Sequence, residues 1–200
     1  MVNVQQQTLI LASSSPRRRD LIRMLPFPVE VLAADVDETI AEPLAPDQVV
    51  ETLALRKAHA VFLLKEEKGL NGVIIGSDTI VVFEGRVLGK PKDDAEARDM
   101  LQALQGRTHQ VFSGVSCIDT ASGMQRTSHR MTKVHMKALS AGQIDRYIAT
   151  GEPADKAGAY AIQGIGATIV EGIEGDYFNV VGLPLSLLSD MLADFGFQTL

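Results

Sequence analysis

A run of hydroxyl and guanidinium side chains lies close to the start of the chain. The segment Ser13–Arg19, with the sequence SSSPRRR, follows an apolar stretch and opens a predicted helix, with Ser15 as N-cap and Pro16 as first residue. Free backbone N–H groups at a helix start bind anions such as phosphate when hydroxyl groups and guanidinium forks stand beside them. An ordinary helix cap followed by surface arginines fits the same pattern, so the segment alone leaves both interpretations open.

An aspartate ends an apolar strand further along the chain. Asp78 comes shortly after Val73–Ile75, and the ends of strands are where α/β folds place catalytic carboxylates. Burial of an isolated carboxylate is costly, so this position needs a chemical or a structural reason. Three roles stay open for it: a general base, a magnesium ligand, or a structural cap of a bend at Gly76.

Two other places combine charge with an unusual setting. Lys57 lies near the apolar face of its predicted helix, where a lysine ordinarily extends its ammonium group to water. The segment Asp155–Gln163 holds an acid, a base and an amide within a few residues, and it also fits a long ordinary loop with Asp155 and Lys156 as a surface pair.

Several motif-like segments lack a required part. The segment Gly85–Lys90 is one residue short of a phosphate loop, with Pro91 in place of the Ser or Thr that would hold magnesium. Asp35–Glu38 lacks the glycine and the spacing of a calcium loop, and Gly164–Gly166 lacks the third glycine of a dinucleotide fingerprint. The histidines and the cysteine show no metal-ligand spacing, which favours structural positions: His59, His109, His129, His135 and Cys117.

Alternation and turn signals place these residues on a mixture of strands and helices. Strands and helices intermix without strict βαβ alternation, which favours a mixed sheet with flanking helices. The predicted strands are Thr8–Ala12, Val29–Ala34, Val73–Ile75 resuming as Ile80–Phe83, Val111–Ile118, Gln125–Met136, Ala167–Ile173 and Tyr177–Val181. The predicted helices run from Pro16 to before Pro26, from Pro46 to about Lys68, from Asp93 to before Gly106, from Ser140 to Gly151, and from Pro184 onward.

Composition sets the class of protein. With 200 residues, 46% of them apolar and 22% charged, and no repeat or linker, the chain is predicted to be one globular domain, 1–200. A net charge of −6 disfavours nucleic acid as the main partner. One cysteine excludes a disulfide framework. No apolar run has the length of a membrane helix, and the N-terminal charge order does not fit a secretory signal, so we expect a cytoplasmic protein.

A set of segments in a fixed order gives a more specific signal than any one of them. Together they resemble the Maf family of nucleoside triphosphate pyrophosphatases along nearly the whole chain. The matching segments are Leu9–Arg18 (LILASSSPRR), Val36–Glu38 (VDE), Lys57-Ala58, Ile75–Thr79 (IGSDT), Leu88–Pro91 (LGKP), Gly106–His109 (GRTH), Glu152–Gln163 (EPADKAGAYAIQ) and Gly182–Pro184 (GLP).

The resemblance implies an activity and a fold. Members hydrolyse a nucleoside triphosphate to the monophosphate and pyrophosphate with a divalent cation, Mg²⁺ or Mn²⁺. Their fold, of the Maf and inosine triphosphatase type, is an elongated, twisted mixed sheet with two lobes around a cleft. The resemblance implies a cytoplasmic homodimer, and the family has been linked to septum formation and division arrest.

The resemblance also implies roles for single residues. Asp78 falls on the family's catalytic aspartate, described as a proton acceptor. Arg17, Thr79 and Gln163 fall on three positions associated with substrate preference, and the branch with these residue types resembles enzymes for dTTP and UTP. A sibling branch, which resembles enzymes for 7-methylguanosine triphosphate, has Trp, Gln and Glu there.

A triphosphate carries about four negative charges, so an acidic protein must concentrate cations locally to bind it. Magnesium in such a site is held by one or two carboxylates together with phosphate oxygens and water; Glu38 and Asp78 are the candidates. The candidate phosphate ligands are Ser13, Arg17, Arg18 and Lys57, with Lys90 and Lys156 as second choices.

Two other functions compete with a dTTP and UTP pyrophosphatase. A broader pyrophosphatase for modified pyrimidine nucleotides predicts the same residues, so only a substrate panel separates the two. A non-catalytic, nucleotide-binding regulator of cell division needs no general base, and the presence of Asp78 counts against it.

Overall fold

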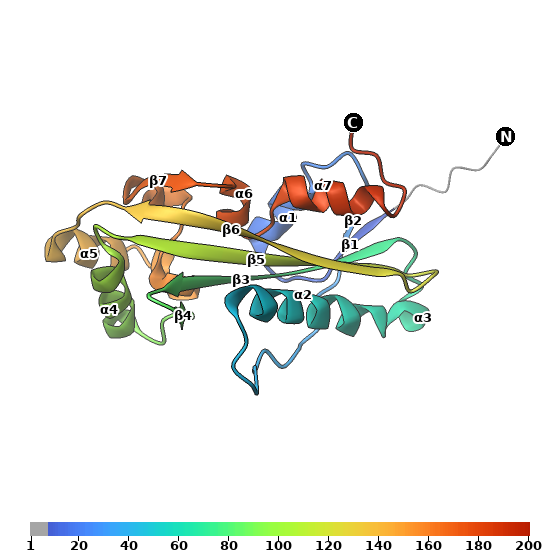
Figure 1. Ribbon diagram of the computed structural model, residues 1–200, viewed down its shortest axis with the longest axis horizontal. Helices are drawn as coiled ribbons and strands as arrows, with labels where there is room; N and C mark the ends of the chain where they lie inside the picture. The colour runs from blue at the N-terminus through green and yellow to red at the C-terminus, as the bar shows by residue number, and fades with distance from the viewer. Residues whose placement is uncertain (1–7) are drawn as a thin grey trace. The chain divides into compact units, whose positions relative to one another are not determined.

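A mixed seven-stranded sheet organises the computed structural model, which describes residues 8–200 (Figure 1). The strand order is β2-β1-β3-β5-β6-β7, with β4 on β3. Strand β1 is parallel to β2 and β3, whereas β4 is antiparallel to β3 and β7 to β6. The strands are β1 Leu9–Leu11, β2 Val29–Val31, β3 Val73–Phe83, β4 Arg86–Leu88, β5 Thr108–Asp119, β6 Gln125–Met136 and β7 Val170–Glu174. The predicted mixed sheet with flanking helices is confirmed.

The helices begin where the sequence places capping residues. Ser15 caps α1, Asp93 accepts a hydrogen bond from the Glu96 N–H at the start of α4, and Ser140 opens α5. The α-helices are α1 Pro16–Ile22, α2 Pro46–Phe62, α3 Lys65–Lys68, α4 Asp94–Leu104, α5 Ala141–Ile148, α6 Tyr177–Val181 and α7 Leu185–Ala193. Three 3₁₀-helices follow α5: η1 Glu152–Asp155, η2 Ala157–Ala159 and η3 Gly164–Thr168. Among residues 8–200, no helix is long and apolar enough to cross a bilayer.

Three sequence predictions of secondary structure need correction. The segment Tyr177–Val181 is helix α6 and not a strand. Asp176 accepts a hydrogen bond from the Phe178 N–H at 2.8 Å, as a helix-capping residue does. A five-residue, mostly apolar segment does not by itself distinguish a strand from a buried helical turn. The predicted helix from Pro46 divides into α2 and α3, and the predicted strand from Ala167 begins as the end of η3 and becomes β7 only at Val170.

The chain divides into two compact units. The first holds residues up to Asp78 together with Ser113–Arg130 and Gly182–Leu200, and the second holds Thr79–Phe112 and Met131–Val181. Strands β3, β5 and β6 each give residues to both units. The single domain and the cleft expected from the sequence stay predictions.

In the first unit, α2 packs directly on the backbone of the sheet. In Figure 1, α2 and α7 lie on opposite sides of the strands. A Cβ atom on Gly76 of β3 would lie 2.1 Å from the carbonyl oxygen of Ala54, and one on Gly114 of β5 would lie 2.2 Å from that of Val50. No side chain fits in that space, so these two glycines set how close α2 comes to β3 and β5.

The core of the second unit contains a histidine. His109 is 2% exposed, and its Nε2 lies 2.7 Å from the hydroxyl group of Tyr160. The two rings meet edge to face, with centroids 5.2 Å apart. Burial, with a smaller contribution from His135, lowers the pKa of His109 to about 4, so the ring is neutral in the folded protein near pH 7. This setting agrees with the predicted structural position.

Acidification is therefore expected to destabilise the fold through His109. The unfolded chain takes up a proton below pH 6.5, whereas the folded protein resists protonation down to about pH 4. The free energy of unfolding, measured by urea denaturation, should fall by up to about 3 kcal/mol from this group between pH 7 and pH 4. The fall should be smaller by that amount in His109→Gln; equal falls in both proteins would contradict this assignment.

Candidate active site

Parallel pairing places the end of β1 beside the first residues of β3. Leu11 pairs with Ile75, and the N–H of Ala12 donates to the carbonyl oxygen of Ile75 at 2.8 Å. Ser13 follows at once and is 7% exposed, and its Oγ accepts a hydrogen bond from the N–H of Ser15 at 3.2 Å. The predicted hydroxyl-rich helix start therefore lies at the point where β3 reaches its polar residues.

One backbone carbonyl joins α1 to β3. The carbonyl oxygen of Gly182 accepts a hydrogen bond from Arg18 Nε at 2.8 Å and another from Ser77 Oγ at 3.0 Å. Gly182 has a φ of 127°, a conformation that favours glycine. Sequence reasoning assigned no role to Ser77 or to this carbonyl, although a serine amid apolar strand residues was an available signal.

The centre of the site is an ammonium group between two carboxylates. Lys57 Nζ, from α2, lies 2.6 Å from Asp78 Oδ1 and 2.7 Å from Glu38 Oε1. The side chains of Lys57 and Asp78 are 14% and 9% exposed, whereas that of Glu38 is 59% exposed. Lys57 thus pairs with a buried carboxylate, and its ammonium group does not extend into water as that of a helical lysine ordinarily does.

The guanidinium groups of α1 add positive charge beside this pair. Burial lowers the pKa of Arg18; Asp78 acts in the opposite direction, Arg17 adds to the lowering, and Glu38 again opposes it. Arginine remains charged under such shifts because its ordinary pKa is above 12. Three cations and two carboxylates therefore interact within the first unit, a combination that suits a polyanion and a water molecule or a metal ion.

The donor set fits a metal ion that shares its coordination with a substrate. Within residues 8–200, no group of three His, Cys, Asp or Glu side chains gathers as a ready-made metal site. Two carboxylates, those of Glu38 and Asp78, do converge on one cationic position. Magnesium is held in this way when phosphate oxygens and water complete its coordination.

The other predicted site residues belong to the second unit. Thr79 follows Asp78 on β3 and is half-buried, and Lys90 is exposed after β4. Gln163 is exposed and precedes η3 as its N-cap residue. Lys156, the other second-choice phosphate ligand, has a side chain that is only 15% exposed.

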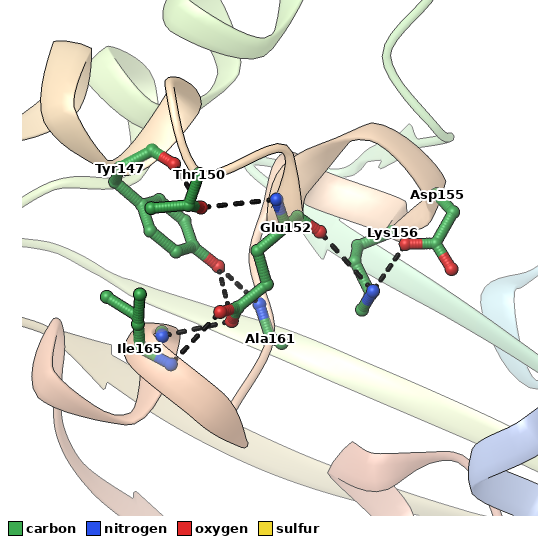
Figure 2. Close-up of polar contacts among 8 residues, drawn as sticks. Tyr147, Thr150, Glu152, Asp155, Lys156, Ala161 and Ile165 are labelled. Atoms are coloured by element: carbon green, nitrogen blue, oxygen red, sulfur yellow. Dashed lines mark hydrogen bonds and ion pairs between the residues drawn. The ribbon is translucent and has the colours of Figure 1, made fainter.

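The surroundings of Lys156 differ from those of a simple surface pair. Its Nζ donates to the carbonyl oxygen of Glu152 at 3.3 Å and contacts the carboxylate of Asp155, which is 68% exposed (Figure 2). The N–H of Gly158 also donates to the carbonyl oxygen of Gly89 at 3.0 Å. That bond ties the loop after Lys156 to the loop that carries Lys90.

Comparison of the sequence with known proteins places this chain in a family. The sequence model of the family described as Maf-like protein matches residues 8–195. A Pelotomaculum thermopropionicum protein named dTTP/UTP pyrophosphatase is 50% identical over 192 residues, covering 96% of this chain and 98% of its own. A Moorella thermoacetica protein of the same name is 50% identical over 189 residues, covering 94% and 95%.

Among solved structures, the Staphylococcus aureus Ham1 protein is similar over 65% of this chain and 72% of its own. The identity is 17% and the TM-score 0.46, which is too low to carry an inference.

Removal of Lys57 is expected to leave the buried carboxylate of Asp78 without its ammonium partner. Lys57→Met should lower the free energy of unfolding by roughly 3–5 kcal/mol, measured by urea denaturation without metal ions. Adding Asp78→Asn in the same chain should recover much of that loss, because the buried charge is then gone.

Lys156→Met is the matched control, since Lys156 is about as buried as Lys57 but pairs with an exposed carboxylate. We expect its cost to stay within about 1 kcal/mol. A Lys57→Met protein as stable as this control would contradict the buried-pair assignment.

Proposed function

We infer that this chain, which belongs to the Maf family, is a nucleoside triphosphate pyrophosphatase that hydrolyses dTTP and UTP to the monophosphate and pyrophosphate. Two relatives named for that activity share half of their residues with it over almost their full lengths. The observation that carries the proposal is the buried Asp78 carboxylate, held by Lys57 beside Glu38 and the arginines of α1.

Binding of the triphosphate is assigned to the cations and hydroxyl group of the first unit. Arg17 and Arg18 offer guanidinium forks, Lys57 a point charge and Ser13 a hydroxyl group, and such groups form charge-assisted hydrogen bonds with phosphate oxygens. Two lysines of the second unit, Lys90 and Lys156, are proposed as additional phosphate ligands. The local positive charge allows a protein of net charge −6 to bind a polyanion.

Hydrolysis is proposed to proceed by attack of water on the α-phosphorus. A new bond forms between the water oxygen and the α-phosphorus, the bond to the bridging oxygen breaks, and pyrophosphate leaves with that electron pair. Asp78 accepts the proton of the water in this scheme, and the ammonium group of Lys57, 2.6 Å from Asp78 Oδ1, holds the carboxylate in place. Positioning and electrostatic stabilisation supply most of the rate in such reactions.

The divalent cation, Mg²⁺ or Mn²⁺, is proposed to be held by Glu38 and Asp78. When bound, such an ion neutralises phosphate charge and polarises the phosphoryl oxygens. The proposed oligomer is a homodimer and the proposed location the cytoplasm, both on the family resemblance.

Recognition of the base is assigned to Gln163, with Thr79 and Arg17 as further specificity residues. Uracil and thymine present an N3–H donor between two carbonyl acceptors. An amide side chain can accept from N3–H and donate to O4 at the same time. A pocket rarely separates substrates that differ by one methyl group by more than about 1–3 kcal/mol, so one site should serve dTTP and UTP.

The proposed role of Asp78 predicts a large loss of turnover in Asp78→Asn. The amide keeps the shape but lacks the basicity and charge, so kcat should fall by roughly 10²–10⁴. The measurement is release of pyrophosphate, separated from phosphate, from each nucleoside triphosphate with Mg²⁺ or Mn²⁺. Asp190→Asn, on an exposed position of α7, is the control. Turnover within a few-fold of the parent would remove Asp78 from the mechanism.

The proposed role of Gln163 predicts a change of base preference in Gln163→Glu. A carboxylate only accepts hydrogen bonds, so it opposes O4 of uracil but suits the N–H donors of guanine. The kcat/KM for UTP and dTTP should fall by a factor that corresponds to a loss of about 1–3 kcal/mol in transition-state binding. The fall in kcat/KM for guanine nucleotides should be far smaller. Equal losses for all bases would show that Gln163 supports its loop without contacting the base.

A further inference from the structure

A single carboxylate gathers the hydrogen-bond donors at the start of η3. Glu152 Oε1 accepts from the Tyr147 hydroxyl group at 3.1 Å and from the Gly166 N–H at 3.0 Å, and Oε2 accepts from the Ile165 N–H at 3.0 Å (Figure 2). These backbone N–H groups lie in the first turn of η3, whose N-cap residue is Gln163. A charged acceptor at such a position gives strong hydrogen bonds that fix the backbone.

The glycines of η3 make room for this carboxylate. A Cβ atom on Gly164 would lie 2.9 Å from Glu152 Oε2. One on Gly166 would lie 2.2 Å from the carbonyl oxygen of Ala161, 2.6 Å from the Tyr147 hydroxyl oxygen and 3.0 Å from Glu152 Oε1. Gly164 also has a φ of 64°, which a residue with a side chain rarely adopts. The glycine pair that is incomplete as a dinucleotide fingerprint therefore has another explanation: the Glu152 carboxylate approaches Gly164, and the Ala161 carbonyl, the Tyr147 hydroxyl group and the same carboxylate approach Gly166.

The segment that leads to Gln163 is held by the same network. The Tyr147 hydroxyl group, besides donating to Glu152, accepts a hydrogen bond from the Ala161 N–H at 3.1 Å. Ala159, just before, has a φ of 59°, a left-handed conformation that is unfavourable for a residue with a Cβ atom. A strained backbone persists where its surroundings over-determine it, as they do here.

The Gln163 side chain itself makes no hydrogen bond to other residues in the 8–200 portion of the chain, and the residue is exposed. Its position therefore depends on the backbone on either side, which Tyr147 fixes at Ala161 and Glu152 fixes at Ile165 and Gly166. The Glu152 carboxylate bonds to the Tyr147 hydroxyl group and to the N–H groups of Ile165 and Gly166, so it acts on the backbone beside Gln163 and not on the Gln163 side chain.

We propose that Glu152 is a positioning residue for base selection. Its carboxylate holds the start of η3 so that the Gln163 amide meets the pyrimidine in one orientation, in which it accepts from N3–H and donates to O4. This role rests on the proposed function of Gln163 as the base contact. Loss of the carboxylate frees the loop, and a freely turning amide also pairs with cytosine, whose N3 accepts and whose N4 donates.

The test compares binding of UTP and CTP analogues whose α,β-bridging oxygen is replaced by an imido group, so that no cleavage is needed. Glu152→Gln keeps the shape but turns one carboxylate oxygen into an amide that opposes a backbone N–H. By calorimetry, the ratio of Kd values for the CTP and UTP analogues should fall by about tenfold, the equivalent of one ordinary hydrogen bond. Binding of pyrophosphate should stay within about twofold, because the network does not include the phosphate ligands of the first unit.

Three further variants make the result specific. Glu171→Gln removes an exposed carboxylate from β7 of the same unit and should leave the ratio unchanged. Glu152→Asp, which keeps the charge but shortens the reach, should lower the ratio by less than Glu152→Gln, and it provides the test if the glutamine variant does not fold. In a Gln163→Ala background, Glu152→Gln should produce no further change in the ratio, because its effect passes through Gln163.

The outcomes separate this proposal from the proposed function. An unchanged ratio in Glu152→Gln overturns the positioning role, as does equal weakening of both analogues and pyrophosphate, which indicates general loss of structure. A parent protein that prefers the UTP analogue yet releases no pyrophosphate from UTP overturns the proposed activity and leaves the positioning result intact. A parent without any base preference overturns both.

Discussion

Desolvation of one carboxylate is the constraint on which the site depends. Asp78 lies in the middle of the largely buried strand β3, five residues before its end and not at the end of a strand as the sequence predicted, and a charge in that position requires a counter-ion. Lys57 supplies it from α2, and α2 can approach only because Gly76 and Gly114 leave the backbone of β3 and β5 bare. The exposed carboxylate of Glu38 completes the arrangement from the loop between β2 and α2. A buried pair of this kind adds little net stability compared with apolar side chains, but it fixes the position of the Asp78 carboxylate.

Much of the secondary structure was predictable from short-range sequence patterns, whereas features that depend on contacts between distant segments were not. The caps at Ser15, Asp93 and Ser140 and the apolar strand before Asp78 were predictable because each depends on a few neighbouring residues. Helix α6 was not, because a short apolar run carries no distinctive period.

Of the site, the residue types were predictable but most of their partners were not. Lys57 of α2 reaches Asp78 of β3 because the helix packs on the sheet, and no rule of sequence spacing predicts that contact. The carbonyl of Gly182 and the carboxylate of Glu152 have roles that depend on chain segments far apart in the sequence, or on backbone N–H groups that carry no side-chain signal. The carboxylates of the two units have different partners: in the first unit Asp78 is held by the ammonium group of Lys57, and in the second unit Glu152 holds backbone N–H groups.

The position of bond cleavage tests the central claim most directly. Hydrolysis of UTP by the parent protein in water enriched in oxygen-18, followed by mass spectrometry of both products, locates the phosphorus that the water attacks. Our account, in which Asp78 activates a water for attack on the α-phosphorus, predicts the label in the monophosphate and unlabelled pyrophosphate. Label in pyrophosphate, or release of phosphate with a nucleoside diphosphate, would contradict it.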